Sequence, residues 1–133
     1  MNLDQFLPYR LAVLSEAVSR SMAQVYAARF ELTRDEWRVL AALAGVAELK
    51  PSALIEQTTL DKMQVSRAVT RLERDGLVGR EDDPDDRRGY RLRLLAPGRA
   101  LYRKIVPMVQ AREQFLLEGL SADEREALEA AMA

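Results

Sequence analysis

The chain of 133 residues is long enough for one domain with a core, and a content of 48% hydrophobic and 31% charged residues excludes an intrinsically disordered chain. It has neither cysteine nor histidine, which excludes disulfides, thiolate nucleophiles and the commonest zinc ligands. The net charge of −1 does not exclude nucleic acid, because Lys62 to Lys104 holds 12 basic and 7 acidic residues, a local net charge of +5.

Residues 3–30 are predicted to form one long helix, because apolar residues recur there at steps of three and four. Pro8 fits only near the start of this helix, since proline has no N–H to donate. Thr33 and Glu36 have the spacing of a capping box, which marks the start of a second helix. This helix is expected to end near Ala44.

Two more helices follow, the first short and the second strongly amphipathic. Pro51 suits the first turn of the short helix. The second is expected over Asp61–Asp75, with Asp61 as its N-cap, Gln64 at the reciprocal position of a capping box and Gly76 after its end. Its apolar stripe consists of Val65, Ala68, Val69 and Leu72.

Two short strands are predicted at residues 77–82 and 89–95, joined by a loop rich in aspartate. In the second strand Tyr90, Leu92 and Leu94 alternate with arginines, which is typical of a strand with one buried face. The pair therefore indicates a β hairpin.

The chain returns to helix over residues 96–119, where Pro107 is expected to kink or interrupt it. Ser121 and Glu124 have the spacing of another capping box and mark the start of the last helix. A short helix, an amphipathic helix and a hairpin in this order are typical of a winged helix-turn-helix.

The expected fold is mainly α with a small β-hairpin wing, in one domain over residues 1–133. The winged helix-turn-helix module is placed at about 33–98. The long helices at about 3–30 and 99–133 carry more apolar surface than this module can cover, so a symmetric dimer is the simplest way to bury it.

The helix Asp61–Asp75 carries polar side chains that suit the major groove of DNA, since arginine can bind guanine and glutamine can pair with adenine. A solvated polar face is the alternative for any single amphipathic helix, and the basic charge of this segment favours DNA. The candidates for contacts with bases or phosphates are Lys62, Gln64, Ser66, Arg67 and Arg71.

The stretch "EDDPDDRRG" between the strands is either a solvated turn or a tip whose Arg87 and Arg88 reach a minor groove. A calcium loop is excluded, because the sixth position counted from Asp83 is an arginine instead of glycine. The chain also has no glycine-rich phosphate loop. No enzyme activity, metal site or cofactor is therefore expected.

Three stretches resemble the MarR-type transcriptional regulators: "LTRDEWRVLAAL", "LDKMQVSRAVTRLERDGLVGREDDPDDRRGYRLRLLAPGRAL" and "LSADEREAL". The middle stretch is similar to the recognition helix, wing and next helix of that family, with Gly-Leu-Val, Asp-x-Arg and Leu-x-x-Gly-Arg at family spacing. The resemblance implies an obligate homodimer, whose two winged modules face successive major grooves of a pseudo-palindromic operator in double-stranded DNA.

The resemblance also implies roles for single residues. Gln64, Ser66 and Arg67 match recognition-helix positions that face bases or phosphates. Asp86 and Arg88 match the Asp-x-Arg of the wing, in which the aspartate pairs with the arginine and holds it in shape for the minor groove.

Many members of the resembled family release DNA when a small aromatic or phenolic compound binds between the dimer region and the winged module. Lys50 departs from the family pattern, which usually has a threonine or serine cap there. Without cysteine and histidine, neither thiol switching nor histidine-based metal sensing is expected. Candidates for an effector site, each of which has plain core or surface as the alternative, are Tyr9, Arg10, Met22, Tyr26 and Trp37.

The sequence therefore predicts a homodimeric, sequence-specific DNA-binding regulator of transcription, most simply a repressor released by a small aromatic or phenolic ligand. No segment approaches 18 uncharged apolar residues, so no membrane contact is predicted, and we expect a cytoplasmic location. Two alternatives remain open: a winged-helix protein-interaction module, or a small-molecule-binding module, either of them without DNA binding.

Overall fold

The computed structural model describes all 133 residues and contains six α helices, one short 3-10 helix and a two-stranded antiparallel sheet. The fold is mainly helical with a β hairpin, as the sequence predicts. In chain order the elements are η1 (Leu3–Gln5), α1 (Leu7–Phe30), α2 (Arg34–Ala44), α3 (Pro51–Thr58), α4 (Lys62–Arg74), β1 (Val78–Asp82), β2 (Tyr90–Leu94), α5 (Ala96–Leu117) and α6 (Ala122–Met132).

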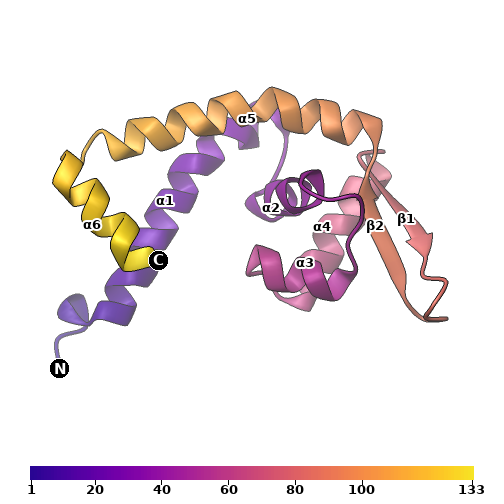
Figure 1. Ribbon diagram of the computed structural model, residues 1–133, viewed down its shortest axis with the longest axis horizontal. Helices are drawn as coiled ribbons and strands as arrows, with labels where there is room; N and C mark the ends of the chain where they lie inside the picture. The colour runs from indigo at the N-terminus through magenta and orange to yellow at the C-terminus, as the bar shows by residue number, and fades with distance from the viewer.

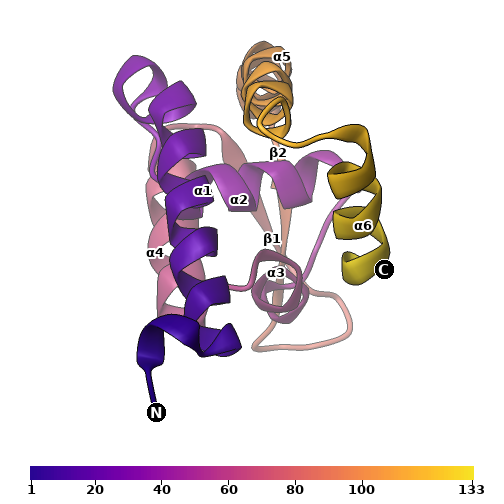
Figure 2. The ribbon, with the colours of Figure 1, turned by 90° about the vertical axis from the view of Figure 1, so that its left-hand side faces the viewer.

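Helix α5 connects two regions of the molecule (Figure 1). The helices α2, α3 and α4 and the hairpin gather beneath one end of α5, and α6 follows from its other end. Helix α1 runs obliquely away from α5, and both chain termini lie on the side opposite the hairpin (Figure 1). Figure 2 shows α1 and α6 on opposite sides below α5, and α6 buries none of its residues.

Helix α1 begins later than the sequence pattern predicts. Phe6 is extended and separates η1 from α1, and the side chain of Asn2 accepts a hydrogen bond from the amide of Asp4 at 3.0 Å. Pro8 lies in the first turn of α1, as predicted. The helix ends at Phe30, and the capping residue Glu31 after it has a left-handed φ of 55°.

The N-termini of α2 and α4 are capped differently. The amide of Glu36 donates to the hydroxyl of Thr33 at 3.1 Å, but the Glu36 carboxylate accepts from that hydroxyl instead of the Thr33 amide, so the predicted capping box is half formed. Asp61 and Gln64 form the complete box, with bonds of 2.8 and 2.9 Å. Helix α4 then ends before Gly76, whose φ of 73° favours glycine.

The hairpin is joined to the rest of the module by backbone hydrogen bonds. Its strands pair in the register that sets Val78 opposite Leu94. A further bridge pairs Leu49, just before α3, with Leu92 of β2, through bonds of 2.8 and 2.9 Å. The chain before α3 therefore lies directly beside the wing.

Helix α5 starts against the base of the hairpin. A Cβ at Gly98 would lie 2.2 Å from the carbonyl oxygen of Leu77, so this close approach requires glycine. Pro107 lies inside α5, which continues on both sides of it, so the helix is not interrupted there.

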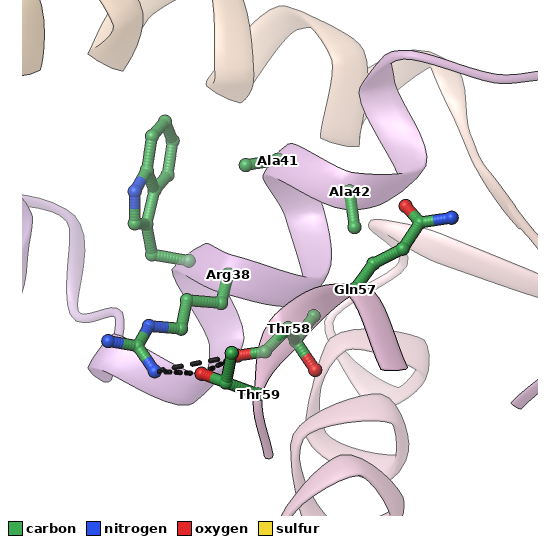
Figure 3. Close-up of a pocket in the computed structure, with 7 residues that line it drawn as sticks. Arg38, Ala41, Ala42, Gln57, Thr58 and Thr59 are labelled. Carbon is green, nitrogen blue, oxygen red and sulfur yellow. Dashed lines mark hydrogen bonds between the residues drawn. The ribbon is translucent and has the colours of Figure 1, made fainter. Parts of the chain in front are cut away.

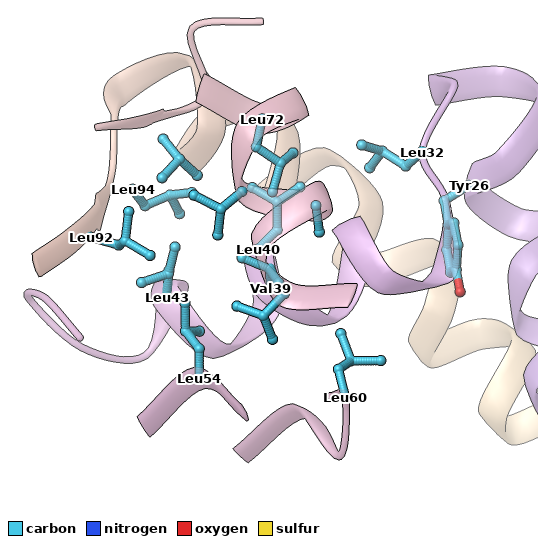
Figure 4. Packing of buried hydrophobic residues seen from close by; sticks show 14 of the residues in the cluster. Tyr26, Leu32, Val39, Leu40, Leu43, Leu54, Leu60, Leu72, Leu92 and Leu94 are labelled. Carbon is cyan, nitrogen blue, oxygen red and sulfur yellow. The ribbon is translucent and has the colours of Figure 1, made fainter. Parts of the chain in front are cut away.

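The core lies mainly within the winged module. Its cluster of 15 buried hydrophobic residues includes five leucines with no exposed surface, which come from α2, α3, α4 and β2 (Figure 4): Leu40, Leu43, Leu54, Leu72 and Leu92. This packing fixes which face of α4 turns outward. None of the helices is long and apolar enough to cross a membrane.

Candidate nucleic-acid interface

Helix α4 turns one face to the core and the opposite face to solvent. The predicted apolar stripe is buried throughout: Val65, Ala68, Val69 and Leu72. With 3.6 residues per turn, the exposed residues opposite this stripe are Met63, Ser66, Arg67, Thr70 and Arg74. The sequence analysis named Ser66 and Arg67 as contact residues but did not name Met63, Thr70 and Arg74, which the angular position of each residue around the helix would have identified.

Lys62 and Gln64 flank this outward face. Lys62 is exposed, whereas Gln64 is half-buried and uses its side-chain oxygen in the capping box. The amide nitrogen of Gln64 takes no part in that box. The Gln64 side chain is thus held at the first turn of α4 by its oxygen, and its NH₂ group is not used in the capping box.

The basic residues of α4 and the hairpin fall into two groups. Five of them have a carboxylate within 4.0 Å: Arg71, Arg74, Arg80, Arg91 and Arg93. The other four are exposed and have no such partner: Lys62, Arg67, Arg87 and Arg88. All four unpaired cations belong to the residues that the sequence analysis selected for DNA contact.

Arg71, also predicted to contact DNA, is tied to α2, and its contact with DNA stays a prediction. Its Nη1 lies 3.3 Å from Oε1 of Glu36, whose side chain is only 3% exposed. A buried carboxylate requires a partner, and the Thr33 hydroxyl alone would leave its charge uncompensated. This pairing spans 35 residues, so no local sequence pattern predicts it.

At the wing tip, Asp86 contacts Arg88 through the backbone. Its Oδ1 accepts a hydrogen bond from the amide of Arg88 at 3.0 Å. The side-chain ion pair that the family resemblance implies is not formed in this structure. The guanidinium groups of Arg87 and Arg88 both lie exposed at the tip.

Asp83 is the buried acid of the wing, and the sequence analysis missed its role. Its side chain is 1% exposed and lies 3.3 Å from Nζ of Lys50 and 3.6 Å from Nη2 of Arg91. The hydrogen bond that it accepts from the amide of Asp85, together with Lys50, lowers the pKa of its carboxyl. Arg91 also pairs with Glu48. These contacts hold the wing against the chain before α3.

A second cluster joins the wing to α4, and we call it the Arg80 clamp: Glu73, Arg80 and Tyr90. Nη2 and Nε of Arg80 donate to Oε1 of Glu73 at 2.7 and 3.2 Å. The guanidinium carbon lies 3.8 Å from the centre of the Tyr90 ring. The hydrogen bond to Glu73 raises the pKa of Arg80. Helix α4 and both strands therefore meet at one side chain.

The five residues predicted for an effector site do not line one cavity in this chain. Trp37 stacks on Tyr26 with ring centres 5.6 Å apart. Tyr9 and Arg10 line a separate pocket of about 390 Å³ along the first turns of α1. Met22 is half-buried on α1 and lines neither of these pockets. The effector assignment of the five residues stays a prediction.

Trp37 does line a pocket of about 430 Å³ between α2 and the end of α3 (Figure 3). Arg38 lies at this pocket, and its Nη1 donates to Oγ1 of Thr59 at 3.0 Å and to the carbonyl of Thr58 at 3.4 Å. Its Nη2 donates to Oγ of Ser19 in α1 at 3.4 Å. No carboxylate pairs with Arg38, a cation that the sequence analysis missed.

Known proteins are similar to this chain over most of its length. A family model described as "MarR family" matches residues 30–89. Transcriptional regulator HosA of Escherichia coli O111:H- is 30% identical over 112 residues, which cover 80% of this chain and 83% of HosA.

Solved structures match the fold as a whole. A mutant of MarR from E. coli complexed with operator DNA is 26% identical, with a TM-score of 0.84, over 95% of this chain and 90% of that one. NadR in complex with 4-hydroxyphenylacetate is also 26% identical, with a TM-score of 0.78, over 96% of this chain and 89% of that one. Together with the exposed face of α4 and the two unpaired arginines at the hairpin tip, these similarities show that the chain belongs to the MarR family of DNA-binding transcriptional regulators and is not an enzyme.

Proposed function

We propose that this chain is a cytoplasmic, homodimeric repressor that binds a pseudo-palindromic operator through α4 and the tip of the hairpin. One observation carries the proposal. Four exposed cations without a carboxylate partner lie together on α4 and the hairpin, two on α4 and two at the hairpin tip: Lys62, Arg67, Arg87 and Arg88. Unpaired basic side chains of this kind bind phosphates and supply much of the affinity for DNA.

The dimensions of α4 support its placement in the major groove. Its 13 residues span about 20 Å, and the groove is about 12 Å wide. The Asp61–Gln64 capping box orders the first turn, from which recognition helices contact bases. Arg67, one turn further along, can bind a guanine with two hydrogen bonds, and Ser66 can bind a phosphate or a base.

The outer helices support the proposed dimer. Leu7, Leu14 and Phe115 are 63%, 58% and 64% exposed, although each is a large apolar side chain. So many exposed large apolar side chains on the outer helices are uncommon on a monomer. A second copy related by a two-fold axis would bury it and would place two copies of α4 on one side of the dimer.

Removal of one unpaired arginine from α4 or from the hairpin tip tests the proposed contacts. Arg67→Ala and Arg88→Ala are each expected to weaken operator binding. The loss is about 1–3 kcal/mol if the arginine contacts a base edge. If the arginine contacts a phosphate, the slope of the logarithm of affinity against the logarithm of salt concentration is reduced by about one. Fluorescence anisotropy titrations of the duplex upstream of the gene, at several salt concentrations, measure both quantities.

Arg93→Ala is the matched control for Arg88→Ala, because it removes the same charge from the same hairpin. Arg93 lies 3.3 Å from Glu81, and both side chains are more than half exposed. Its replacement is expected to leave affinity close to that of the wild type. Equal losses in all three variants would indicate a general charge effect, and unchanged affinity for Arg67→Ala and Arg88→Ala would contradict the proposed contacts.

The proposal includes a small aromatic or phenolic effector that binds beside Trp37 and Arg38. A volume of about 430 Å³ lies within the usual range for small-molecule sites. Trp37 offers an aromatic wall and Arg38 a cation without a carboxylate partner. Because Arg38 bonds to Ser19 of α1 and to the turn before α4, an anionic ligand that attracts it would weaken the contact between these elements.

The compound 4-hydroxyphenylacetate, which is bound in the NadR structure, is a suitable probe because it combines an aromatic ring with a carboxylate. Calorimetric titration is expected to show binding to the wild type and much weaker binding to Arg38→Gln. Arg34→Gln, on the same helix but paired with Glu16 and Asp35, is the control. If the Arg38 and Arg34 variants bind the probe equally well, the proposed role of Arg38 is wrong.

A further inference from the structure

Two exposed apolar side chains are not explained by the proposed dimer. Nearly all exposed large hydrophobic residues belong to residues 1–18 or 115–132, where a second copy would cover them. Only two belong to the winged module: Val46, which is 39% exposed, and Met63, which is 67% exposed. Val46 follows α2 in a loop, whereas Met63 lies on α4 itself.

Met63 lies on the most outward line of α4. Nine residues, or two and a half turns, separate it from the fully buried Leu72, so the two side chains point in opposite directions. Ser66 and Arg67 follow Met63 by three and four residues and share its face. Met63 also lies in the first turn, next to the capping residue Asp61 and the unpaired Lys62.

We propose that Met63 contacts the 5-methyl group of a thymine in each half-site and is a specificity-determining residue of this regulator. The inference rests on the proposed placement of α4 in the major groove. The thymine methyl is the apolar group that base edges present there, and it distinguishes thymine from the other bases. Among the other residues of this surface only Thr70 carries a methyl group, and it lies about two turns further along α4. The rest contact bases through polar or charged groups, and their hydrogen bonds cannot detect a methyl group.

The chemistry of methionine suits this contact. Its unbranched, polarizable thioether adapts its shape to the surface that it meets. In the free protein this side chain is in water, and contact with the methyl group would remove apolar surface of both partners from water. Burial of one methyl group changes affinity by about fourfold.

Deoxyuridine provides the direct test, because it differs from thymidine only by the absent methyl group. In the operator duplex that the wild type binds, each thymine is replaced by deoxyuridine, together with its symmetry mate in the other half-site. Dissociation constants at one salt concentration are measured for the wild type, Met63→Ala, Met63→Leu and Val46→Ala. Thermal unfolding of each variant shows that these exposed substitutions leave the fold intact.

We expect the wild type to lose affinity on the order of fourfold per half-site at one symmetric thymine position. Met63→Ala is expected to bind the unmodified operator more weakly and to lose nothing further at that position. Met63→Leu should retain the preference for the methyl group. Val46→Ala should show the same pattern as the wild type.

A Met63→Ala variant with the same deoxyuridine pattern as the wild type would overturn the inference. The inference would also be overturned if Met63→Ala lost affinity equally for the operator and for unrelated DNA and kept the deoxyuridine pattern of the wild type. Both results leave operator recognition intact, because the wild type still prefers its operator. If the wild type bound the operator and unrelated duplexes equally well, both the proposed function and this contact would be wrong.

Discussion

Asp83 and Asp86 lie three residues apart in the same aspartate-rich loop, yet their surroundings differ. Asp83 is buried between Lys50 and Arg91, whereas Asp86 is exposed and bonds to the amide of Arg88. Two cations at a buried carboxylate hold the wing in place, while the Asp86 bond orders only the turn at its tip. The acids of this loop therefore have a structural role and do not act only as repulsion toward DNA.

Asp83→Asn is expected to lower the melting temperature, because it leaves Lys50 and Arg91 without their shared partner. The folded state lowers the pKa of Asp83, so its contribution to stability is full above the pKa of an unfolded aspartate. That contribution is lost as the pH falls from there through the lowered pKa. Melting curves of wild type and Asp83→Asn should therefore differ most near neutral pH and converge in acid.

Asp82→Asn is the control for this comparison, since Asp82 is exposed and forms no ion pair. Its melting curve should follow that of the wild type. If Asp83→Asn melts like Asp82→Asn at neutral pH, the buried contacts of Asp83 do not stabilise the wing.

At the scale of elements, the Arg80 clamp sets how the hairpin lies relative to α4. Arg80 is on β1, Glu73 is on α4 and Tyr90 is on β2, so one guanidinium contacts all three elements. The partly exposed ion pair alone contributes little to stability. We expect its geometric effect to be larger, because in the proposed complex the wing tip reaches DNA only at the correct angle to α4.

Glu73→Gln is expected to weaken operator binding by on the order of 1 kcal/mol, although it removes a negative charge from the surface proposed to face DNA. Arg80→Lys should have a similar effect, because lysine keeps the charge but cannot form both hydrogen bonds to Glu73. Anisotropy titrations measure both variants. In the Arg88→Ala variant, the further loss of operator affinity caused by Glu73→Gln should be smaller, since the proposed contact between the wing and DNA is already reduced.

Glu81→Gln is the matched control, because Glu81 pairs only with Arg93 within the hairpin. It should leave affinity unchanged or slightly increased. Tighter binding by Glu73→Gln would mean that its charge merely repels DNA and that the clamp has no positioning role.

The sequence predicted those elements whose signals are local. The Asp61 and Ser121 caps are both complete capping boxes in the structure, and the alternation around Leu92 gave the second strand. The short helix starts at Pro51 as expected. Such signals depend on neighbours within one turn or one strand, so the positions of the elements could be predicted.

The pairing of side chains could not be predicted in the same way. Arg71 and Glu36 are 35 residues apart, and Lys50 and Asp83 are 33 residues apart. These contacts depend on how α2 meets α4 and on the bridge between Leu49 and Leu92. Composition alone assigns every arginine of α4 and the wing the same role, and only the packed structure separates the paired ones from the free ones.

At the scale of the whole molecule, α5 links the outer helices to the winged module (Figure 1). The proposed dimer contact along α1 and α6 therefore determines the distance between the two copies of α4. The basic segment from Lys62 to Lys104 covers α4, the hairpin and the start of α5, whereas the acidic excess lies before it in residues 31–61 and after it in residues 105–133. This distribution favours α4 and the hairpin, and not the rest of the chain, as the surface that meets phosphates.

Hydroxyl-radical footprinting of the operator complex tests most directly the central claim that a two-fold dimer binds DNA through α4 and the wing. We expect two symmetric protected regions, with centres about one helical turn, roughly 34–36 Å, apart or a multiple of it. Arg67→Ala should weaken both regions equally, because each half-site meets one copy of the same helix. A single protected region without two-fold symmetry, or a pattern that Arg67→Ala leaves unchanged, would contradict this claim.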